Sequence, residues 1–535
     1  MRRIELPKPP VILALCAAAA LLVGHALYFN FVNDDAYISF RYADNLVRHG
    51  ELVYNPGERV EGYTNFLWTV TMAAFMGLGG DPVFWSRVLG IGFGLGGMWL
   101  VYRFLAKFRG EGHGIGQGRL VDTLGPLWLA ATPAFACWST GGLETQQFTF
   151  FATLGWTAYL LEEQAKPKFR WSGVYFALSA LARPEGMLFF GLTGVHRLVS
   201  ILKPPGRRPT DPDEPPPAPS TLRKRRLPSR NDLLWGAGFV AVFGPYFAWR
   251  WTYYGWPLPN TYYVKAGSDS FWGPGLQYYW TWVRDHDLFV WPVFVVLAAR
   301  VRGLWPLLGL LFVGLSVHVM KIGGDFMGLH RFLVPLMPML AVVLSLGVEK
   351  LLARLAEGGV SMRIPAAVGV VLALALGYQT VRTDRWAMQT GSEGGVDRIG
   401  WLKMFEGQCR AIGLYLRDNA APDATLATTA AGIIPYYSRL YTVDILGLND
   451  EYIAHEVPAR GSRPGHTKVA PHEYLMKKQI DYLVYHPTIS ERAISQADAA
   501  RTGSPGRDYV WESVQVPDLA PPYWGYWFRK TAKAP

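Results

Sequence analysis

The sequence has few charged residues and few cysteines for its length. Only 17% of its 535 residues are Asp, Glu, Lys or Arg, whereas 50% are hydrophobic and 14% are aromatic. This balance argues against an ordinary soluble protein and is typical of a polytopic membrane protein. Cys16, Cys137 and Cys409 lie far apart, and no CxxC pair or His-rich spacing occurs. The sequence therefore indicates neither a disulfide framework nor a zinc site.

Other common functional signals are also missing. The chain has no Gly-rich phosphate loop of the Walker or Rossmann type, and it has no internal repeat. Its formal net charge of +11 would suggest nucleic acid binding in a soluble protein. Here, however, Lys and Arg gather in short segments between apolar runs, where they set membrane topology. We therefore expect no nucleic acid partner.

Long apolar runs are what the sequence has instead. The first, at about 11–29, follows the basic start MRRIELPKPP and resembles a signal sequence. A run of about 19 residues suffices to cross a bilayer, and no clear cleavage site follows, so we expect an uncleaved anchor with a cytoplasmic N-terminus. Later runs fall at roughly 82–106, 121–138, 146–161, 172–182, 185–201, 232–253, 287–300, 303–320, 332–348 and 364–380. About eleven transmembrane helices are predicted.

Charge decides the side on which each loop lies. If the run at 63–79 re-enters or lies in the interface without crossing, the loops rich in Lys and Arg all become cytoplasmic, as such loops should. These loops are 107–119, 162–170, 203–231, 299–302 and 349–363. The remaining polar loops then share the outer face with everything after about residue 382. The runs at 172–182 and 185–201 flank Arg183-Pro184 and are either two short spans or one kinked element.

Two regions differ from the apolar runs. Residues 203–230 are rich in Pro and basic residues, and we expect a disordered cytoplasmic linker whose RKRR cluster sets topology rather than serving as a binding signal. After residue 382, helix-like WLKMFEGQCRAIGLYLRDN precedes strand-like TLATTA, LYTVDIL and DYLVYHP. We therefore predict a transmembrane module at 1–381, with an outer catalytic loop at 30–80, and a periplasmic soluble α/β domain at 382–535.

Polar and charged residues concentrate at 33–69, just after the first apolar run. Such density at a membrane surface is expensive and usually functional. Asp34 and Asp35 open the stretch. They fit N-caps of the helix AYISFRYADNLV, but this helix is too polar to face lipid, which favours a site. A carboxylate here is suited to act as general base, as nucleophile or as a ligand of a divalent cation, and the sequence does not separate these roles.

The outer loops supply further candidates for donor-phosphate or substrate binding. Single acidic residues stand in short loops bracketed by Gly or Pro: Glu61, Glu144, Glu185 and Asp325. Basic partners that would hold a lipid phosphate, or only anchor the chain at the interface, are Arg41, Arg59, Arg183, Lys265, His330 and Arg331. Asn55, Tyr63, Asn65, Asn260 and Tyr263 complete the set. The aromatic residues around Trp256 form either an interfacial belt or the lining of a sugar or lipid path.

Several of these segments together resemble a known family. They are DDAYISFRYADNLVRHGELVYNPGERVEGYTNFLWT, GGLET, ARPEG, PLPNTYYVK, GGDFMGLHRFLVP, DILGLND and GHTKVAPHEYL. From about residue 30 to 490 the chain is similar to the mycobacterial terminal arabinofuranosyltransferases B and related bacterial polyprenyl-phosphate-dependent glycosyltransferases. The resemblance implies the glycosyltransferase C fold. It also implies a required acidic residue in the first outer loop, a role that falls on Asp34 or Asp35.

The resemblance also implies a reaction in the bacterial inner membrane. A polyprenyl-phosphate sugar, decaprenyl-phosphoryl arabinofuranose in the mycobacterial case, would be transferred to a cell-envelope glycan on the periplasmic face. No cofactor is certain, and a divalent cation is an open possibility. Asp34 or Asp35 would deprotonate the acceptor hydroxyl. If the linkage forms with retention, a carboxylate would instead serve as nucleophile or ion-pair partner.

Two other functions remain open at this point. One is a polymerase or ligase that moves a glycan from a polyprenyl diphosphate and shares this topology. The other is a transporter or flippase of lipid-linked sugars. A transporter should show ionisable residues at mid-span and internal pseudo-repeats, whereas the charges of this chain gather at the predicted outer ends of the spans.

Overall fold

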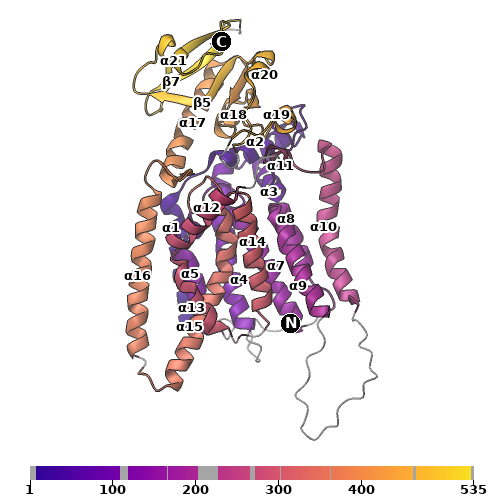
Figure 1. Cartoon of the computed structure of the whole chain (residues 1–535), viewed down its shortest axis with the longest axis vertical. Helices are drawn as coiled ribbons and strands as arrows, with labels where there is room; N and C mark the ends of the chain where they lie inside the picture. Colours follow the sequence, from indigo (N-terminus) through magenta and orange to yellow (C-terminus); the bar gives the residue numbers. More distant parts are fainter. Residues whose placement is uncertain are drawn as a thin grey trace.

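A bundle of long helices carries a smaller α/β domain at one end (Figure 1). The computed structural model describes residues 8–108, 118–165, 167–202, 227–265, 271–299, 301, 303–361, 363–461 and 466–531. We call the end of the bundle that carries the α/β domain the domain end, and α1 begins at the opposite end. Most of the linker predicted at 203–230 lies outside the described residues.

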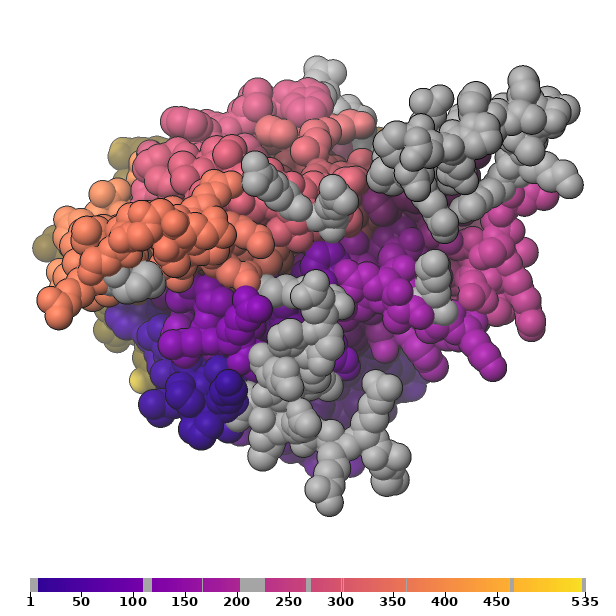
Figure 2. Space-filling view, turned by 90° about the horizontal axis from the view of Figure 1, so that it is seen from below, coloured from indigo at the N-terminus to yellow at the C-terminus, as the bar shows by residue number. Residues whose placement is uncertain are grey.

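Helices of different lengths follow the predicted apolar runs. They are α1 (Pro9–Phe29), α4 (Pro82–Phe108), α5 (Leu124–Ala131), α6 (Pro133–Cys137), α7 (Thr145–Ala165), α8 (Ser172–Ala182), α9 (Glu185–Leu202), α10 (Arg230–Tyr254), α13 (Trp291–Ala298), α14 (Trp305–Lys321), α15 (Met337–Glu357) and α16 (Arg363–Ala387). Among the described residues, α1, α4, α9, α15 with the turn before it, and α16 are long and apolar enough to cross a membrane. The chain is a multi-pass membrane protein. Seen from the end opposite the domain, α16 and α10 lie on opposite sides of the molecule (Figure 2).

Proline divides one of the predicted spans. The run at 121–138 forms a 3-10 turn, η2 (Leu120–Thr123), and the two helices α5 and α6. Thr132 has extended backbone, and Pro133 is the first residue of α6. A proline at this position has no backbone N–H to continue the preceding helix. The hydrophobic run therefore predicts the span but not its break.

The pair of runs around Arg183-Pro184 forms two antiparallel helices rather than one kinked helix. Arg183 is extended, with φ −155° and ψ 144°, so α8 ends there. α9 then returns along α8 so closely that a Cβ on Gly186 would lie 2.2 Å from the amide nitrogen of Ala180. Glycine permits this approach, which brings Arg183 to the turn at the domain end.

The polar stretch after α1 forms a surface helix and a short apolar helix. α2 (Asp34–His49) is capped by Asn33, whose side chain accepts a hydrogen bond from the amide of Asp35 at 2.9 Å. Because Asn33 is the cap, both aspartate side chains are left for other contacts. α3 (Phe66–Gly77) has 12 residues and is about 18 Å long. It is too short to cross a hydrocarbon core of about 30 Å.

The remaining elements of the bundle are two helices and two 3-10 turns. They are α11 (Asn260–Lys265), α12 (Trp272–Asp285), η3 (Leu288–Val290) and η4 (Arg331–Leu336). Of these, η3 leads directly into α13 and η4 leads directly into α15. α16 continues to Ala387, past the domain boundary predicted at 381, and leads through the hairpin β1 (Ser392–Glu393) and β2 (Val396–Asp397) into the α/β domain.

The α/β domain is built on a mixed five-stranded sheet in the order β4-β3-β5-β7-β6. The strands are β3 (Thr425–Thr428), β4 (Tyr441–Asp444), β5 (Tyr482–Ser490), β6 (Tyr509–Gln515) and β7 (Tyr523–Arg529), and the helices are α17 (Ile399–Asn419), α18 (Ile433–Ser438), α19 (Glu451–Glu456), α20 (His472–Lys477) and α21 (Gln496–Thr502). β3 pairs in parallel with β4 and β5, whereas β7 pairs antiparallel with β5 and β6. The sequence predicts α17 and β3 to β5 but not the last two strands.

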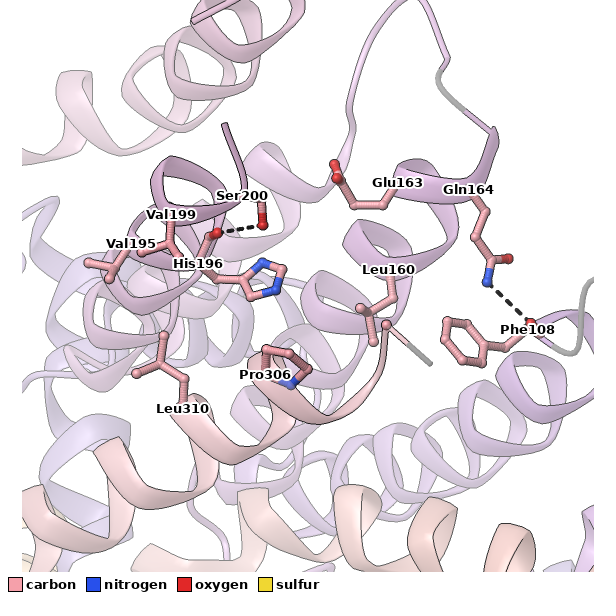
Figure 3. A pocket seen from close by; sticks show the side chains of 11 residues that line it. Phe108, Leu160, Glu163, Gln164, Val195, His196, Val199, Ser200, Pro306 and Leu310 are labelled. Atoms are coloured by element: carbon pink, nitrogen blue, oxygen red, sulfur yellow. Dashed lines mark hydrogen bonds between the residues drawn. The ribbon is translucent and has the colours of Figure 1, made fainter. Parts of the chain in front are cut away.

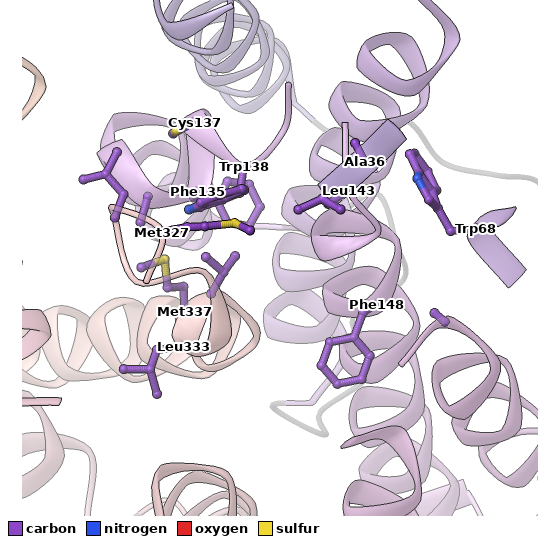
Figure 4. Close-up of a cluster of buried hydrophobic side chains, with 14 of the residues drawn as sticks. Ala36, Trp68, Phe135, Cys137, Trp138, Leu143, Phe148, Met327, Leu333 and Met337 are labelled. Carbon is purple, nitrogen blue, oxygen red and sulfur yellow. The ribbon is translucent and has the colours of Figure 1, made fainter. Parts of the chain in front are cut away.

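A cluster of buried apolar side chains fixes the segments that carry polar residues at the domain end (Figure 4). It contains Ala36 of α2, Trp68 of α3, Trp138 beside α6, Phe148 of α7 and Leu333 of η4. Close packing of these side chains stabilises the contacts between the segments through many van der Waals contacts. Segments far apart in the sequence are thereby held next to one another at this end.

Candidate active site

Asp35 lies in the first turn of α2 and faces a group of charged residues. Desolvation raises the pKa of Asp35 to about 6. Arg331 and Lys265 lie close enough to lower this pKa, and Asp325 and Glu144 close enough to raise it. Among the residues that the structure describes, none donates a hydrogen bond to the carboxylate of Asp35. The carboxylate is therefore held in a charged environment with its oxygens still available.

A chain of buried ion pairs forms one side of this environment. Arg183 donates hydrogen bonds to Glu144 at 2.6 Å and to Glu185 at 2.7 Å. Glu144 in turn accepts a hydrogen bond from the side chain of Asn65 at 2.8 Å. The guanidinium of Arg183 also lies 4.8 Å from the ring centroid of Phe332. The donors of Arg183 are thus largely engaged within the protein.

Arg331 forms the other side of this environment, and fewer of its hydrogen-bond donors have a partner than those of Arg183. Its Nε donates to Asp325 at 2.8 Å, and its guanidinium lies 5.0 Å from the ring centroid of Phe332 and 5.5 Å from that of Trp138. No described residue accepts a hydrogen bond from its two terminal nitrogens. We call Asp35, Glu144, Arg183, Glu185, Lys265, Asp325 and Arg331 the charge cluster. All of its members belong to the predicted site set, and the structure brings them together.

Asp34 points away from the charge cluster to the α/β domain. Its carboxylate accepts hydrogen bonds from the amides of Ile433 at 2.8 Å and Gly432 at 3.1 Å, at the start of α18. Burial raises the pKa of Asp34 to about 7, although these two amides lower it. A Cβ on Gly432 would lie only 1.8 Å from the backbone oxygen of Asp34. The contact between α2 and α18 therefore depends on glycine at this position.

Three more predicted site residues also join the bundle to the α/β domain. Arg41 donates to the carbonyls of Tyr54, Pro435 and Leu440 and to the side chain of Asn55. Asn55 donates to the carbonyl of Thr442 at 2.9 Å. Asn260 donates to the carbonyls of Gly447, Leu448 and Asp450. We call Asp34, Arg41, Asn55 and Asn260 the interdomain seam, because their polar groups meet groups of the α/β domain.

The other predicted residues lie outside both groups. Glu61 forms a buried ion pair with Arg250, and the hydroxyl of Tyr63 lies 3.2 Å from that of Tyr254. Arg59 lies over the ring of Tyr253 at 4.8 Å. The ring of Tyr263 lies 4.2 Å from that of His455. His330 contacts Thr281 through Nε2 at 3.0 Å and packs against Tyr278.

Sequence reasoning did not identify Arg250. Its signal was present, because it is a single charged residue near the end of the apolar run at 232–253. A charge in such a position usually has a partner, and Glu61 is that partner.

The described residues contain no group of three or more His, Cys, Asp or Glu side chains arranged to hold a metal ion. A cavity of about 600 Å³ lies at the end of the bundle opposite the domain (Figure 3). Phe108, Leu160, His196 and Leu310 line it, together with Glu163, which also pairs with Arg197 at 2.7 Å. Since it lies between the far ends of α4, α7, α9 and α14, it is separate from the charge cluster.

Comparisons with known proteins agree with this architecture. Residues 401–527 match a family model described as Domain of unknown function (DUF8728). The terminal beta-(1->2)-arabinofuranosyltransferase of Mycobacterium tuberculosis is 26% identical over 286 residues, 52% of this chain and 42% of that protein. The enzyme of the same name from Corynebacterium glutamicum is 24% identical over 362 residues, 58% of this chain and 47% of that protein. The chain thus spans less than half the length of these curated relatives.

Solved structures match over nearly the whole chain. The crystal structure of ArnT from Cupriavidus metallidurans bound to undecaprenyl phosphate covers 98% of this chain and 99% of that one, with a TM-score of 0.54 and 12% identity. The apo structure of the same protein gives a TM-score of 0.52 with 11% identity. Identity at this level shows the fold alone. The predictions of fold and of resemblance are confirmed: the chain has the glycosyltransferase C fold, and about half of its sequence is similar to terminal arabinofuranosyltransferases.

Proposed function

We propose that this protein is a membrane glycosyltransferase that moves an arabinofuranose-like sugar from a polyprenyl-phosphate donor to a cell-envelope glycan. The observation that carries the proposal is the pair of Asp35 and Arg331. Each keeps polar atoms without a partner among the described residues, and both lie in the charge cluster between the apolar bundle and the α/β domain. The similar arabinofuranosyltransferases, and the ArnT structure of the same fold bound to undecaprenyl phosphate, support the donor class.

Arg331 holds the phosphate of the donor in this proposal. Its two terminal nitrogens form a fork that matches two phosphate oxygens. When the bond between the sugar and the phosphate breaks, negative charge grows on the phosphate, and a fixed guanidinium stabilises it. Arg183 already bridges two carboxylates, so its part is to position Glu144 and Glu185. The polyprenyl tail lies among the apolar spans.

Asp35 acts on the acceptor. A carboxyl with a pKa of about 6 is mostly ionised at pH 7. It accepts the proton of an acceptor hydroxyl while the oxygen of that hydroxyl forms a bond to the sugar carbon. Asp34 is less suited because its carboxylate already accepts two amide hydrogen bonds. With the acceptor reaching the charge cluster from the domain end, this end faces the periplasm and the N-terminus faces the cytoplasm.

Purified protein in lipid nanodiscs tests the proposal directly. The donors are a panel of polyprenyl-phosphate sugars and a panel of polyprenyl-diphosphate glycans. The acceptors are arabinofuranosyl oligosaccharides. We expect transfer from a polyprenyl-phosphate pentofuranose, measured as a mass increase of the acceptor. Transfer only from the diphosphate glycans would favour a ligase, and no transfer from any donor would contradict the proposal.

A further inference from the structure

Exposed aromatic side chains gather at the domain end, beside the loop that leads to Lys265. Trp256, Tyr262 and Tyr452 are 39%, 53% and 44% exposed. Trp256 and Tyr262 belong to the bundle, on α11 and the loop before it, whereas Tyr452 belongs to α19 of the α/β domain. We call Trp256, Tyr262, Tyr263, Tyr452, His455 and Tyr474 the aromatic platform. Exposed aromatic side chains that lie together on a domain beyond the spans are a candidate binding site.

The rings of the platform are held in place before any ligand binds. The indole of Trp256 stacks on His455 with centroids 3.9 Å apart and an angle of 28°, and its Nε1 donates to Glu451 at 3.0 Å. Tyr452 stacks on Tyr474 at 4.5 Å and 20°. Two stacked pairs with fixed orientation lose little conformational freedom when a ligand covers them, which favours affinity.

The platform is not an ordinary interfacial belt, because part of it stands on the α/β domain. Tyr452 and His455 lie on α19 and Tyr474 on α20, which belong to the domain beyond the end of the bundle (Figure 1). Belt residues sit at the level of the lipid headgroups. The pairing of Trp256 with His455 instead joins the two parts of the molecule across their junction.

The charged side chains near Trp256 are of the types that proteins use to bind sugars. A small depression of about 10 Å³ beside Trp256 is lined by Arg59, Glu61, Asn260 and Glu451 and is too small to hold a sugar ring. Glu61 and Asn260 already pair with Arg250 and with backbone carbonyls, so the charged groups left at its rim for a ligand are Arg59 and Glu451. Sugar rings present C–H groups that stack on the negative face of an aromatic ring. Their hydroxyls are both donors and acceptors and pair with carboxylates and guanidinium groups. A lipid tail would use the rings but not these charges.

The platform is continuous with the charge cluster through α11. Tyr262 and Tyr263 lie on this six-residue helix, which ends at Lys265, and Lys265 acts electrostatically on Asp35. We propose that the aromatic platform binds the acceptor glycan, several sugar residues away from the hydroxyl that reacts at Asp35. This inference rests on the proposed function and adds the place and the chemical class of acceptor binding.

Acceptor length provides the test. Initial rates are measured with arabinofuranosyl di-, tetra- and hexasaccharides at a fixed donor concentration. The wild type should show a KM that falls with acceptor length. Trp256→Ala and Tyr262→Ala should raise the KM for the hexasaccharide about two- to tenfold, because each removes one stacking contact. The increase should become smaller as the acceptor shortens. Trp280→Ala is the control, because Trp280 is 65% exposed on α12 and outside the platform.

Each other outcome overturns a distinct part of the argument. If the wild type transfers sugar with the same KM for all lengths, the platform has no role although the proposed function stands. If Trp256→Ala lowers the thermal unfolding temperature without changing any KM, the ring only holds the bundle against the α/β domain through His455 and Glu451, and the platform does not bind the acceptor. If no acceptor is glycosylated, the proposed function fails. Saturation-transfer NMR then measures binding of the hexasaccharide to wild type and to Trp256→Ala independently of transfer. Equal spectra for the two proteins would contradict the proposal that the aromatic platform binds the acceptor.

Discussion

The charge cluster and the interdomain seam differ in how their hydrogen-bonding groups are used. Both draw residues from the stretch at 33–69, and both lie where the bundle meets the α/β domain. In the seam, Arg41 and Asn260 donate mainly to backbone carbonyls, and Asp34 accepts backbone amides. In the charge cluster, charged side chains lie next to one another, and Asp35 and Arg331 have polar atoms without a partner among the described residues. A saturated network holds structure together, whereas an unsaturated one is available to a substrate.

The boundary between the interdomain seam and the charge cluster falls between two consecutive residues, Asp34 and Asp35. Neighbouring positions on an α-helix point about 100° apart, so Asp34 and Asp35 at the start of α2 face different parts of the molecule. Asp34 meets α18, and Asp35 meets the charge cluster. Substitutions that act on one region and spare the other separate the two roles.

The largest effect is expected for Asp35→Asn. An amide of the same shape neither accepts a proton from the acceptor nor attacks as an anion, so kcat should fall by about 10²–10⁴-fold. Its thermal unfolding temperature should stay close to that of the wild type, because no described residue donates to this carboxylate. Rates of sugar transfer and a melting curve on the same sample check both points.

Arg331→Gln should have the next largest effect. Loss of a fixed cation beside the leaving phosphate costs about 10²–10³-fold in kcat. The variant also leaves Asp325 without its partner, so folding is checked by the elution profile in detergent. Arg501→Gln is the matched control, because Arg501 forms an exposed pair with Asp498 and such pairs contribute about 0–1 kcal/mol. Equal activity of both variants would contradict the role of Arg331.

Gly432→Ala should act on the seam and have a smaller effect. The new Cβ would meet the backbone of Asp34, and relief of such overpacking costs about 1–3 kcal/mol. We expect a lower melting temperature and faster proteolysis between the bundle and the α/β domain. Gly407→Ala is the control, because a Cβ there has no neighbour within 4 Å. Identical melting of the two variants would show that α18 does not depend on close contact with α2.

Much of the fold follows from the sequence because apolar runs are long and their ends carry charges. α4, α7, α10 and α16 lie where hydropathy places them. β6 and β7 were not predicted, although YWGYWFR is rich in the aromatic residues that strands favour. The break at Pro133 depends on a local backbone choice that hydropathy does not report.

The candidate site is less predictable than the fold, because tertiary contacts decide which predicted residues belong to the charge cluster and which to the interdomain seam. The sequence shows that Asp34 and Asp35 are unusual, but Asp34 is distinguished only by the amides of Gly432 and Ile433, far along the chain. Arg41 and Asn55 have the residue types of a phosphate site. Their donors meet carbonyls of the α/β domain, and no local pattern encodes such partners.

The central claim is that Asp35, and not Asp34, is the carboxylate that takes the proton of the acceptor. Its most direct test is the pH dependence of kcat/KM in the wild type and in Asp34→Asn. Since the pKa of Asp35 is raised to about 6 and the base must be ionised, the rate should be constant above this pH and fall about tenfold per unit below it. The same acid limb should persist in Asp34→Asn. Its disappearance in that variant would contradict the assignment.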